Sequence, residues 1–536
     1  MKKIMAMMVG AMLTAATEVT AGGILTNTNQ SIDFLRNPAR DASIGIDGVY
    51  SNPAGVAFLP EGLHLSFNWQ YAHQTRTIES TSPFFALGRK NNGQTTKTFE
   101  GVADAPCIPS VQAAYNVGNW SWQFNFSVPG GGGSCEFSDG LGSFESVVGN
   151  IATSFMTLDG MATQLNGLTT QLAPLYGMLG QTAPAAIPNT GVKGYDMDGY
   201  MQGRQYYFGF QLGTAYKVNE HFSVYGGLRL LYGTATYKAK ISNIMVGTQG
   251  GYVDFRDFLP QVPGQAAQNA AVAQQHLALL NQDEQAGVPM NEQLTQARTA
   301  LTQGLQQLQQ SQGQLATLSK YAEGVNLLCN QSSVGVAPII GVDYKFGNFN
   351  FAAKYEFKTQ IRMKNESTVN EASEIAAVNK FRDGEYVNED APALLAVGAQ
   401  WTPAEGVRVN AGYHHFFDKD ADWYNNTQSL LDYDTNEYLL GAEWDVNDRL
   451  TVSAGGQLTR YGLTDDYMND MSFVVNSYSL GFGFNYKVSD VVTLKAAYFQ
   501  TNYGTYDRTD YPPLSGMNDS FTRTNRVLGV GVDVNL

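Results

Sequence analysis

The stretch Val111–Val128 reads VQAAYNVGNWSWQFNFSV and holds two alternating runs separated by Gly118-Asn119. Apolar side chains occupy every second position before this turn, and the alternation resumes after it with Trp120, Trp122 and Phe124. Alternation of period two is typical of a β-strand with one apolar and one polar face. A two-residue turn between two such runs predicts a β-hairpin.

The same hairpin pattern recurs five more times along the chain. Its other short turns fall at residues 219–220, 347–348, 405–406, 447–448 and 489–490. The long connections fall at about residues 76–108, 129–205, 242–331, 362–390, 418–434, 462–473 and 502–523. One alternating run precedes the six hairpins and one ends the chain, so 14 strands are expected. Short turns that alternate strictly with long loops predict an all-β fold, a 14-stranded antiparallel transmembrane β-barrel.

Composition excludes several other classes of protein. The formal net charge is -15, whereas a protein that binds the nucleic-acid backbone needs an excess of basic side chains. Aromatic residues make up 12% of the chain, too many for a disordered protein. No apolar run after residue 21 approaches the roughly 20 residues of a transmembrane helix. A large soluble all-β protein also has alternating strands, but it does not explain the strict rhythm of short and long connections.

The N-terminus has the pattern of an export signal. Lys2 and Lys3 precede an apolar stretch over residues 4–13, and the small-residue sequence Val19-Thr20-Ala21 follows. A basic start, a short apolar region and an A-x-A-like site predict a signal peptide over residues 1–21. The alternative, a membrane anchor, requires a longer apolar segment.

The segment between this signal and the first strand lacks alternation. It contains Asn52, Pro53, Ala54 and Gly55 in succession, within Asp47–Ala57. This stretch, ahead of the predicted strands, resembles the hatch of the long-chain fatty-acid transporter (FadL) family, which includes aromatic-hydrocarbon channels of Gram-negative outer membranes. The resemblance implies an N-terminal hatch over residues 22–61 inside a barrel of residues 62–536. It also implies a monomer in outer-membrane lipid that takes up hydrophobic compounds passively, above all long-chain fatty acids, without a cofactor.

The resemblance also implies where substrate binds. In that family the mature N-terminus reaches the inner pocket, helical external loops form a groove for incoming substrate, and a kinked third strand opens the wall toward lipid. The corresponding residues here are Gly22, Gly23, Ile24 and Leu25 for the pocket, and Pro129, Gly130, Gly131, Gly132 and Gly133 for the lateral portal.

Two of the long loops show helical periodicity, at about residues 129–205 and 242–331. In the second loop Leu294, Leu301, Leu308 and Leu315 recur with a period of seven. Such amphipathic helices need an apolar partner. Either they pack only on each other, or their apolar faces also line a groove at the barrel mouth.

Strand parity directs four basic side chains toward the barrel interior: Arg229, Lys354, Arg408 and Lys495. A buried cation with hydrogen bonds is what a fatty-acid carboxylate requires. The alternative is that these cations pair with acids of the lumen such as Glu356. Cys107 and Cys135 lie at the outer end of one hairpin, so a disulfide between them is one possibility.

Nothing in the sequence indicates catalysis or a metal site. The six histidines form no ligand cluster, the cysteine spacing matches no metal knuckle, and G-x-S-x-G is absent. Two other functions remain open, a diffusion porin for polar solutes and a surface adhesin that acts through the helical loops. The predicted hatch favours a channel for hydrophobic compounds over both.

Overall fold

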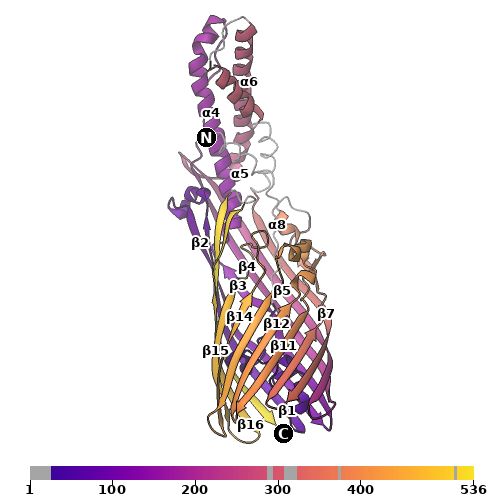
Figure 1. The fold of residues 1–536 in the computed structure, drawn as a ribbon. Helices are drawn as coiled ribbons and strands as arrows, with labels where there is room; N and C mark the ends of the chain where they lie inside the picture. The colour runs from indigo at the N-terminus through magenta and orange to yellow at the C-terminus, as the bar shows by residue number, and fades with distance from the viewer. Residues whose placement is uncertain (1–25, 286–291, 293, 307–322, 372–375, 512–515) are drawn as a thin grey trace.

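The computed structural model describes residues 26–285, 292, 294–306, 323–371, 376–511 and 516–536. Its strands form one antiparallel sheet that closes on itself, because β1 pairs with both β2 and β18 (Figure 1). The strands are β1 (Gly62–Thr81), β2 (Thr96–Val117), β3 (Trp120–Phe137), β4 (Gly194–Lys217), β5 (Phe222–Thr248), β6 (Gly251–Asp254), β7 (Val325–Phe346), β8 (Phe349–Glu356), β9 (Arg362–Ser367), β10 (Tyr386–Asn388), β11 (Leu394–Ala404), β12 (Val407–Phe416), β13 (Asn436–Asp445), β14 (Leu450–Arg460), β15 (Ser477–Lys487), β16 (Val492–Tyr503), β17 (Tyr506–Tyr511) and β18 (Met517–Asn535).

These segments make up a closed barrel of 14 strands, as predicted. β8 and β9 both pair with β7 and together form one staggered wall strand, and β10 and β11 form the next. β16 and β17 both pair with β18 and also count as one wall strand. The short β6 pairs with the end of β5 above the wall and is not counted. The short turns and the C-terminus lie at one end of the barrel, called the lower end here, and the long connections lie at the other, upper end (Figure 1). Each wall strand pairs with a neighbour on both sides, so the sheet has no free edge strand, and the one long break in pairing lies between β2 and β3.

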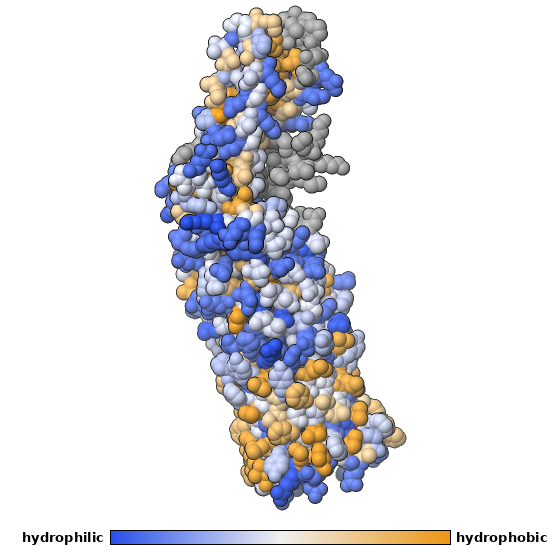
Figure 2. All heavy atoms as spheres, turned by 90° about the vertical axis from the view of Figure 1, so that its left-hand side faces the viewer, coloured by the Kyte–Doolittle hydropathy of each residue, from blue (hydrophilic) through white to orange (hydrophobic). Residues whose placement is uncertain are grey.

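The distribution of buried residues is the inverse of that in a soluble protein. On the lower half of β1, Ser66 and Gln70 are buried inside the barrel, whereas Phe67 is 45% exposed on the outer surface. The other lower strand halves follow the same rule, so exposed apolar side chains form a belt around the lower barrel. Figure 2 shows one face of this belt, where apolar residues gather on the lower part of the barrel below a more polar region. A soluble all-β protein would bury the apolar face instead, so the belt removes that alternative.

The strands are longer than the sequence pattern predicted. The loop expected over residues 129–205 is shorter, because β3 continues to Phe137 and β4 begins at Gly194. The loop expected over 242–331 is shorter for the same reason, since β5 ends at Thr248 and β7 starts at Val325. Above the apolar belt the outer face of the barrel meets water, so its side chains need not be apolar. The strands continue to pair there, but their sequence no longer shows the alternation that predicts a strand.

Two long helices, α4 (Gly142–Met178) and α6 (Val262–Gln285), rise from the barrel mouth (Figure 1). The lower half of α4 packs over the mouth, where Phe155 meets Phe255 and Phe258. Its upper half packs against α6 and the helical residues 294–306 through buried side chains such as Leu172 and Leu280. Leu308 and Leu315 lie outside the described residues. None of the described helices is both long enough and apolar enough to cross a bilayer.

The helical segments complete the structure. They are α2 (Ile32–Arg36), α3 (Gly48–Ser51), η1 (Gly55–Phe58), η2 (Pro83–Leu87), η3 (Arg89–Asn91), α4 (Gly142–Met178), α5 (Phe255–Phe258), η4 (Leu259–Gln261), α6 (Val262–Gln285), α8 (Ala376–Asn379), η5 (Asp418–Asp420) and η6 (Tyr424–Leu430). The first three belong to residues 26–61, which lie within the lower barrel.

Candidate functional site

Residues 26–61 occupy the lower lumen, the part of the barrel interior nearest the short turns. Ile32 and Leu35 of α2 are fully buried against the wall. The wall makes room for this segment at inward-facing glycines: a Cβ at Gly441 would lie 2.0 Å from Asn37 Oδ1, and a Cβ at Gly481 would lie 2.0 Å from the carbonyl oxygen of Leu35. The lower lumen is therefore packed like a protein core.

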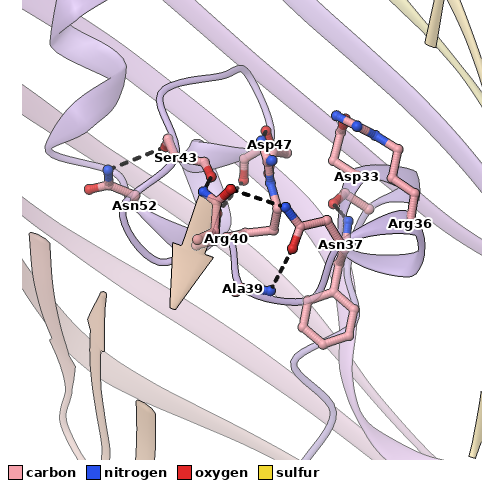
Figure 3. A network of polar contacts seen from close by, with 12 residues as sticks. Asp33, Arg36, Asn37, Ala39, Arg40, Ser43, Asp47 and Asn52 are labelled. Atoms are coloured by element: carbon pink, nitrogen blue, oxygen red, sulfur yellow. Dashed lines mark hydrogen bonds and ion pairs between the residues drawn. The ribbon is translucent and has the colours of Figure 1, made fainter. Parts of the chain in front are cut away.

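Charged side chains connect this segment to the wall. Figure 3 shows Asp33, Arg36, Arg40 and Asp47 within the segment. Arg36 pairs with Asp33 at 2.7 Å and with Glu443 of β13 at 2.9 Å. Arg40 pairs with Asp47 and with the same Glu443, each at 2.8 Å. All five side chains are nearly inaccessible to solvent. Ionised groups withdrawn from water in this way are stable only when they are paired and hydrogen-bonded.

The residues 52–55 that resemble the hatch motif are held by three different strands. The Asn52 side-chain amide donates to Asp343 Oδ2 at 2.6 Å on β7. The carbonyl oxygen of Pro53 accepts from Gln123 Nε2 at 2.8 Å on β3. The carbonyl oxygen of Ala54 accepts from Ser223 on β5. These contacts fix the conformation of the segment and leave the four residues buried beside the wall.

The four cations predicted as carboxylate ligands all have acidic partners. Arg229 and Lys354 both pair with Glu356, at 2.5 and 2.8 Å. Lys354 also donates to the carbonyl oxygen of Tyr50 at 2.8 Å.

The other two cations lie nearer the short turns. Arg408 pairs with Glu443 at 3.0 Å and with Asp445 at 2.7 Å. Lys495 pairs with Asp33 and Asp533. Because these four side chains are already neutralised, their geometry favours the structural alternative stated above. The pocket residues predicted at the mature N-terminus, Gly22–Leu25, lie outside the described residues.

The wall is interrupted between β2 and β3. The ladder pairs Val111 with Phe126, then stops, and pairs again only at Ala103 with Cys135. The residues between these two pairs form no ladder across the junction. This gap lies opposite Tyr71 of β1, at the upper margin of the apolar belt.

The portal positions predicted at residues 129–133 lie within this gap. The register of β3 with β4 shifts twice over this run, as it does at β-bulges. Gly131 and Gly133 adopt φ values of 102° and 73°, which residues with a Cβ rarely adopt. The carbonyl oxygen of Pro129 turns inward and accepts from the Asn27 backbone amide at 2.9 Å. The glycine run thus bends β3 away from β2 and toward residues 26–61.

A cavity with about 1020 Å³ of empty space occupies the gap. Asn29 and Gln70 line it from the lumen. Asp104 lines it from the outer surface, where its carboxylate accepts a hydrogen bond from the Tyr71 hydroxyl at 3.0 Å. The cavity therefore leads through the barrel wall.

A second cavity, with about 760 Å³ of empty space, lies above the first, and Gly133 lines both. Its lining is largely apolar and includes Phe137, Met201, Leu327 and Phe381. Together the two cavities make up the upper lumen, which residues 26–61 do not fill. The apolar lining of the second cavity offers contact to an apolar ligand, whereas the lining of the first cavity is mainly polar.

Two arginines of the upper lumen were not predicted as site residues from the sequence. Arg76 lines the second cavity and Arg523 lines the first. Both positions fell in stretches expected to be loops, because the apolar alternation had already ended. Continuing the parity of β1 upward from Gln70 would have placed Arg76 on the inner face.

Comparison with known proteins identifies the fold. No protein-family model and no curated protein sequence matches the chain. Among solved structures, a Pseudomonas aeruginosa FadL homologue aligns with a TM-score of 0.52 and 11% identity over 96% of this chain and 100% of that chain. A deletion variant of the TodX monoaromatic hydrocarbon channel aligns with a TM-score of 0.50 and 12% identity over 95% and 99% of the two chains.

The chain has the FadL fold. The Pseudomonas putida toluene transporter TodX is a further similar structure, with a TM-score of 0.49 and 12% identity over 96% of this chain and 100% of that chain. At identities this low, the structural alignments establish only the architecture of a FadL-type barrel. The chemistry of the lumen has to be inferred from the residues of this chain.

Cys107 and Cys135 are free thiols in this FadL-type barrel, so the disulfide considered above is absent. Cys135 lies opposite Ala103, four residues from Cys107 along β2, which is about 13 Å along a strand. A disulfide requires the two Cα atoms to lie within about 7 Å of each other. Within the described part of the chain, no group of three or more His, Cys, Asp or Glu residues is arranged to hold a metal ion.

Proposed function

We propose that this chain is a channel in the outer membrane of a Gram-negative bacterium, exported by its signal peptide, that admits hydrophobic compounds by passive diffusion. Long-chain fatty acids are its proposed principal substrates, and no catalytic step is proposed. The observation that carries this proposal is the cavity at the β2–β3 gap, which joins the upper lumen to the outer surface at the margin of the apolar belt.

The proposed route enters from above and leaves sideways. An apolar molecule that reaches the upper lumen meets residues 26–61 below it, and their packing and ion pairs with the wall would oppose its passage through the lower lumen. The gap offers a way around this hatch into lipid. Because the gap opens next to the belt, the solute would not need to cross water to reach the bilayer.

The remaining family features stay part of the proposal. Gly22–Leu25 would contribute to the inner pocket, and α4 with α6 would flank the path of incoming substrate. The channel would act as a monomer. A FadL homologue and a monoaromatic hydrocarbon channel among the similar structures support a hydrophobic substrate class, without choosing between acids and neutral hydrocarbons.

Native mass spectrometry of the gently extracted protein tests this proposal, with identification of every molecule that dissociates from it. We expect a fatty acid or another apolar molecule in near-stoichiometric amount. In planar bilayers we expect little ion conductance, because the lower lumen is packed. An empty barrel that conducts ions freely would instead identify a porin for polar solutes and overturn the proposal.

A further inference from the structure

Two arginines lie side by side in the wall of the upper lumen, and this arrangement does not stabilise the barrel. Arg76 of β1 and Arg523 of β18 are direct cross-strand partners. Residues paired in this way have Cβ atoms about 5 Å apart, and like charges in that arrangement destabilise a sheet. Both side chains line cavities of the lumen.

Neither guanidinium has an acidic partner among the described residues. The Nε atoms of both arginines are buried without a hydrogen-bond acceptor. Arg523 donates only to two neutral groups, the carbonyl oxygen of Phe473 at 3.2 Å and Gln74 Oε1 at 3.3 Å, and its guanidinium lies over the Tyr503 ring. Both side chains are half-buried, and an ionised group partly withdrawn from water without a counter-charge is costly, so an anion that enters from outside would supply the missing partner.

The surroundings indicate what kind of anion fits. Arg76 shares its cavity with Phe137, Met201, Leu327 and Phe381, which offer contact to an apolar chain and no negative charge. Two guanidinium groups side by side can each donate to a carboxylate, which has two acceptor oxygens. An apolar chamber with a dicationic rim therefore suits a molecule with a long apolar tail and one carboxylate head.

We propose that Arg76 and Arg523 form the head-group site of this channel and select long-chain carboxylic acids over neutral hydrocarbons. The inference rests on the proposed function, since it concerns a ligand of the same lumen. The carboxylate binds between the two arginines, and the tail lies among the apolar side chains of the adjoining cavity. Arg229, Lys354, Arg408 and Lys495 do not take this role, because their own acids already neutralise them.

The test compares an acid with a neutral analogue of the same chain length. Binding of palmitate and of methyl palmitate is measured on the full-length protein in nanodiscs, for the wild type, R76Q, R523Q and the double variant. R526Q is the matched control, because Arg526 lies on the same strand but is exposed on the outer surface. Glutamine keeps a polar side chain of similar reach and removes the charge.

We expect the double variant to lose about tenfold or more in palmitate affinity, which corresponds to the loss of a charge-assisted hydrogen bond. Its affinity for methyl palmitate should stay within about twofold of the wild-type value, and R526Q should bind both ligands normally. An unchanged palmitate affinity in the double variant, or an equal loss for both ligands, would overturn the inference.

Thermal unfolding of the empty protein supplies a second readout. The double variant should melt at or above the wild-type temperature, because a like-charge pair has been removed, while the stabilisation by palmitate is lost. A lower melting temperature without ligand would mean that the arginines support the fold, and would overturn the inference. Wild-type protein that binds neither ligand would refute the proposed function itself. Binding of both ligands without any effect of the variants would refute only the head-group site.

Discussion

The lower and upper halves of the lumen use the same residue types in opposite ways. In the lower lumen, Arg36 and Arg40 are surrounded by carboxylates, and residues 26–61 leave little space between segment and wall. In the upper lumen, Arg76 and Arg523 face each other across neighbouring strands without an acid, beside two cavities. A buried arginine is thus uninformative by itself. Its partners distinguish a structural contact from a candidate binding group.

This difference accounts for where the barrel can open. Every charge pair that joins residues 26–61 to the wall must be broken to move that segment, and breaking a buried pair leaves an unpaired ion behind. The β2–β3 gap, by contrast, is open without moving anything, because the glycine run of β3 has already left the ladder. The proposed lateral route would therefore cost less free energy than a route through the lower lumen.

The largest expected effect comes from removing the acid shared by the lower lumen. Glu443→Ala leaves Arg36, Arg40 and Arg408 without their common partner. We expect a loss of about 3–5 kcal/mol in the free energy of unfolding, since buried cations then lack compensation. Urea titration of the refolded barrel measures it, with Glu405→Ala in an exposed turn as the control. A loss below about 1 kcal/mol would contradict the comparison, because the lower lumen would then tolerate unpaired charge.

A second change tests whether the gap is the route. Deleting Gly131 and Gly132 removes two residues from the run over which β3 shifts register twice against β4. We expect a straightened β3 that pairs with β2, and fatty-acid uptake that falls to the level of vesicles without protein. Uptake of labelled oleate into proteoliposomes measures this. The control is Gly226→Ala, since a Cβ there meets no neighbouring atom within 4 Å. Normal uptake by a folded deletion variant would exclude the lateral route.

The smallest effect concerns the rim of the upper lumen, above the strands. The Asp470 carboxylate accepts from the backbone amide of Ser143 at the start of α4, at 2.8 Å. Burial and the nearby charge of Asp519 raise the pKa of Asp470 to about 6. Because this pKa lies above the ordinary value of 3.8, the contribution of the protonated group to stability is complete below pH 3.8 and is lost as the pH rises through 6.

Asp470→Asn keeps an acceptor for Ser143 and removes the charge. Above pH 6 the variant should hold α4 more firmly than the wild type, by no more than about 3 kcal/mol, and below pH 4 the two should be alike. Hydrogen exchange of the first turns of α4 between pH 4 and pH 8 measures the difference. A variant that is less protected at high pH would show that ionised Asp470 supports the docking of α4.

The sequence predicted the 14-stranded barrel correctly, because the strands alternate wherever the outer surface is apolar. Where the outer surface is apolar, each strand must alternate, as in VQAAYNVGNWSWQFNFSV, so strands and short turns can be counted without a structure. The upper strand halves have polar residues on both faces, and this is why β3 was expected to end near Pro129 but continues to Phe137. Backbone pairing above the belt leaves no periodic trace in the sequence.

The candidate site was less predictable. Parity correctly suggested cations that face inward at Arg229 and Lys495, but parity cannot say which acids they meet. Glu356 is a neighbour of Arg229 only because β8 follows β7 around the wall. The kink at residues 129–133 was expected from the resemblance to the FadL family, and the positive φ angles of Gly131 and Gly133 are consistent with a bend there.

By itself, the sequence determined the number of strands and the outward, apolar side of each strand, because these depend on local periodicity. Only the tertiary structure decided which charges are paired. Arg76 and Arg523 lie at opposite ends of the chain and become neighbours when β18 closes against β1. Whether a charge is neutralised depends on atoms within a few ångströms of it in space, and that neighbourhood forms only when the barrel closes.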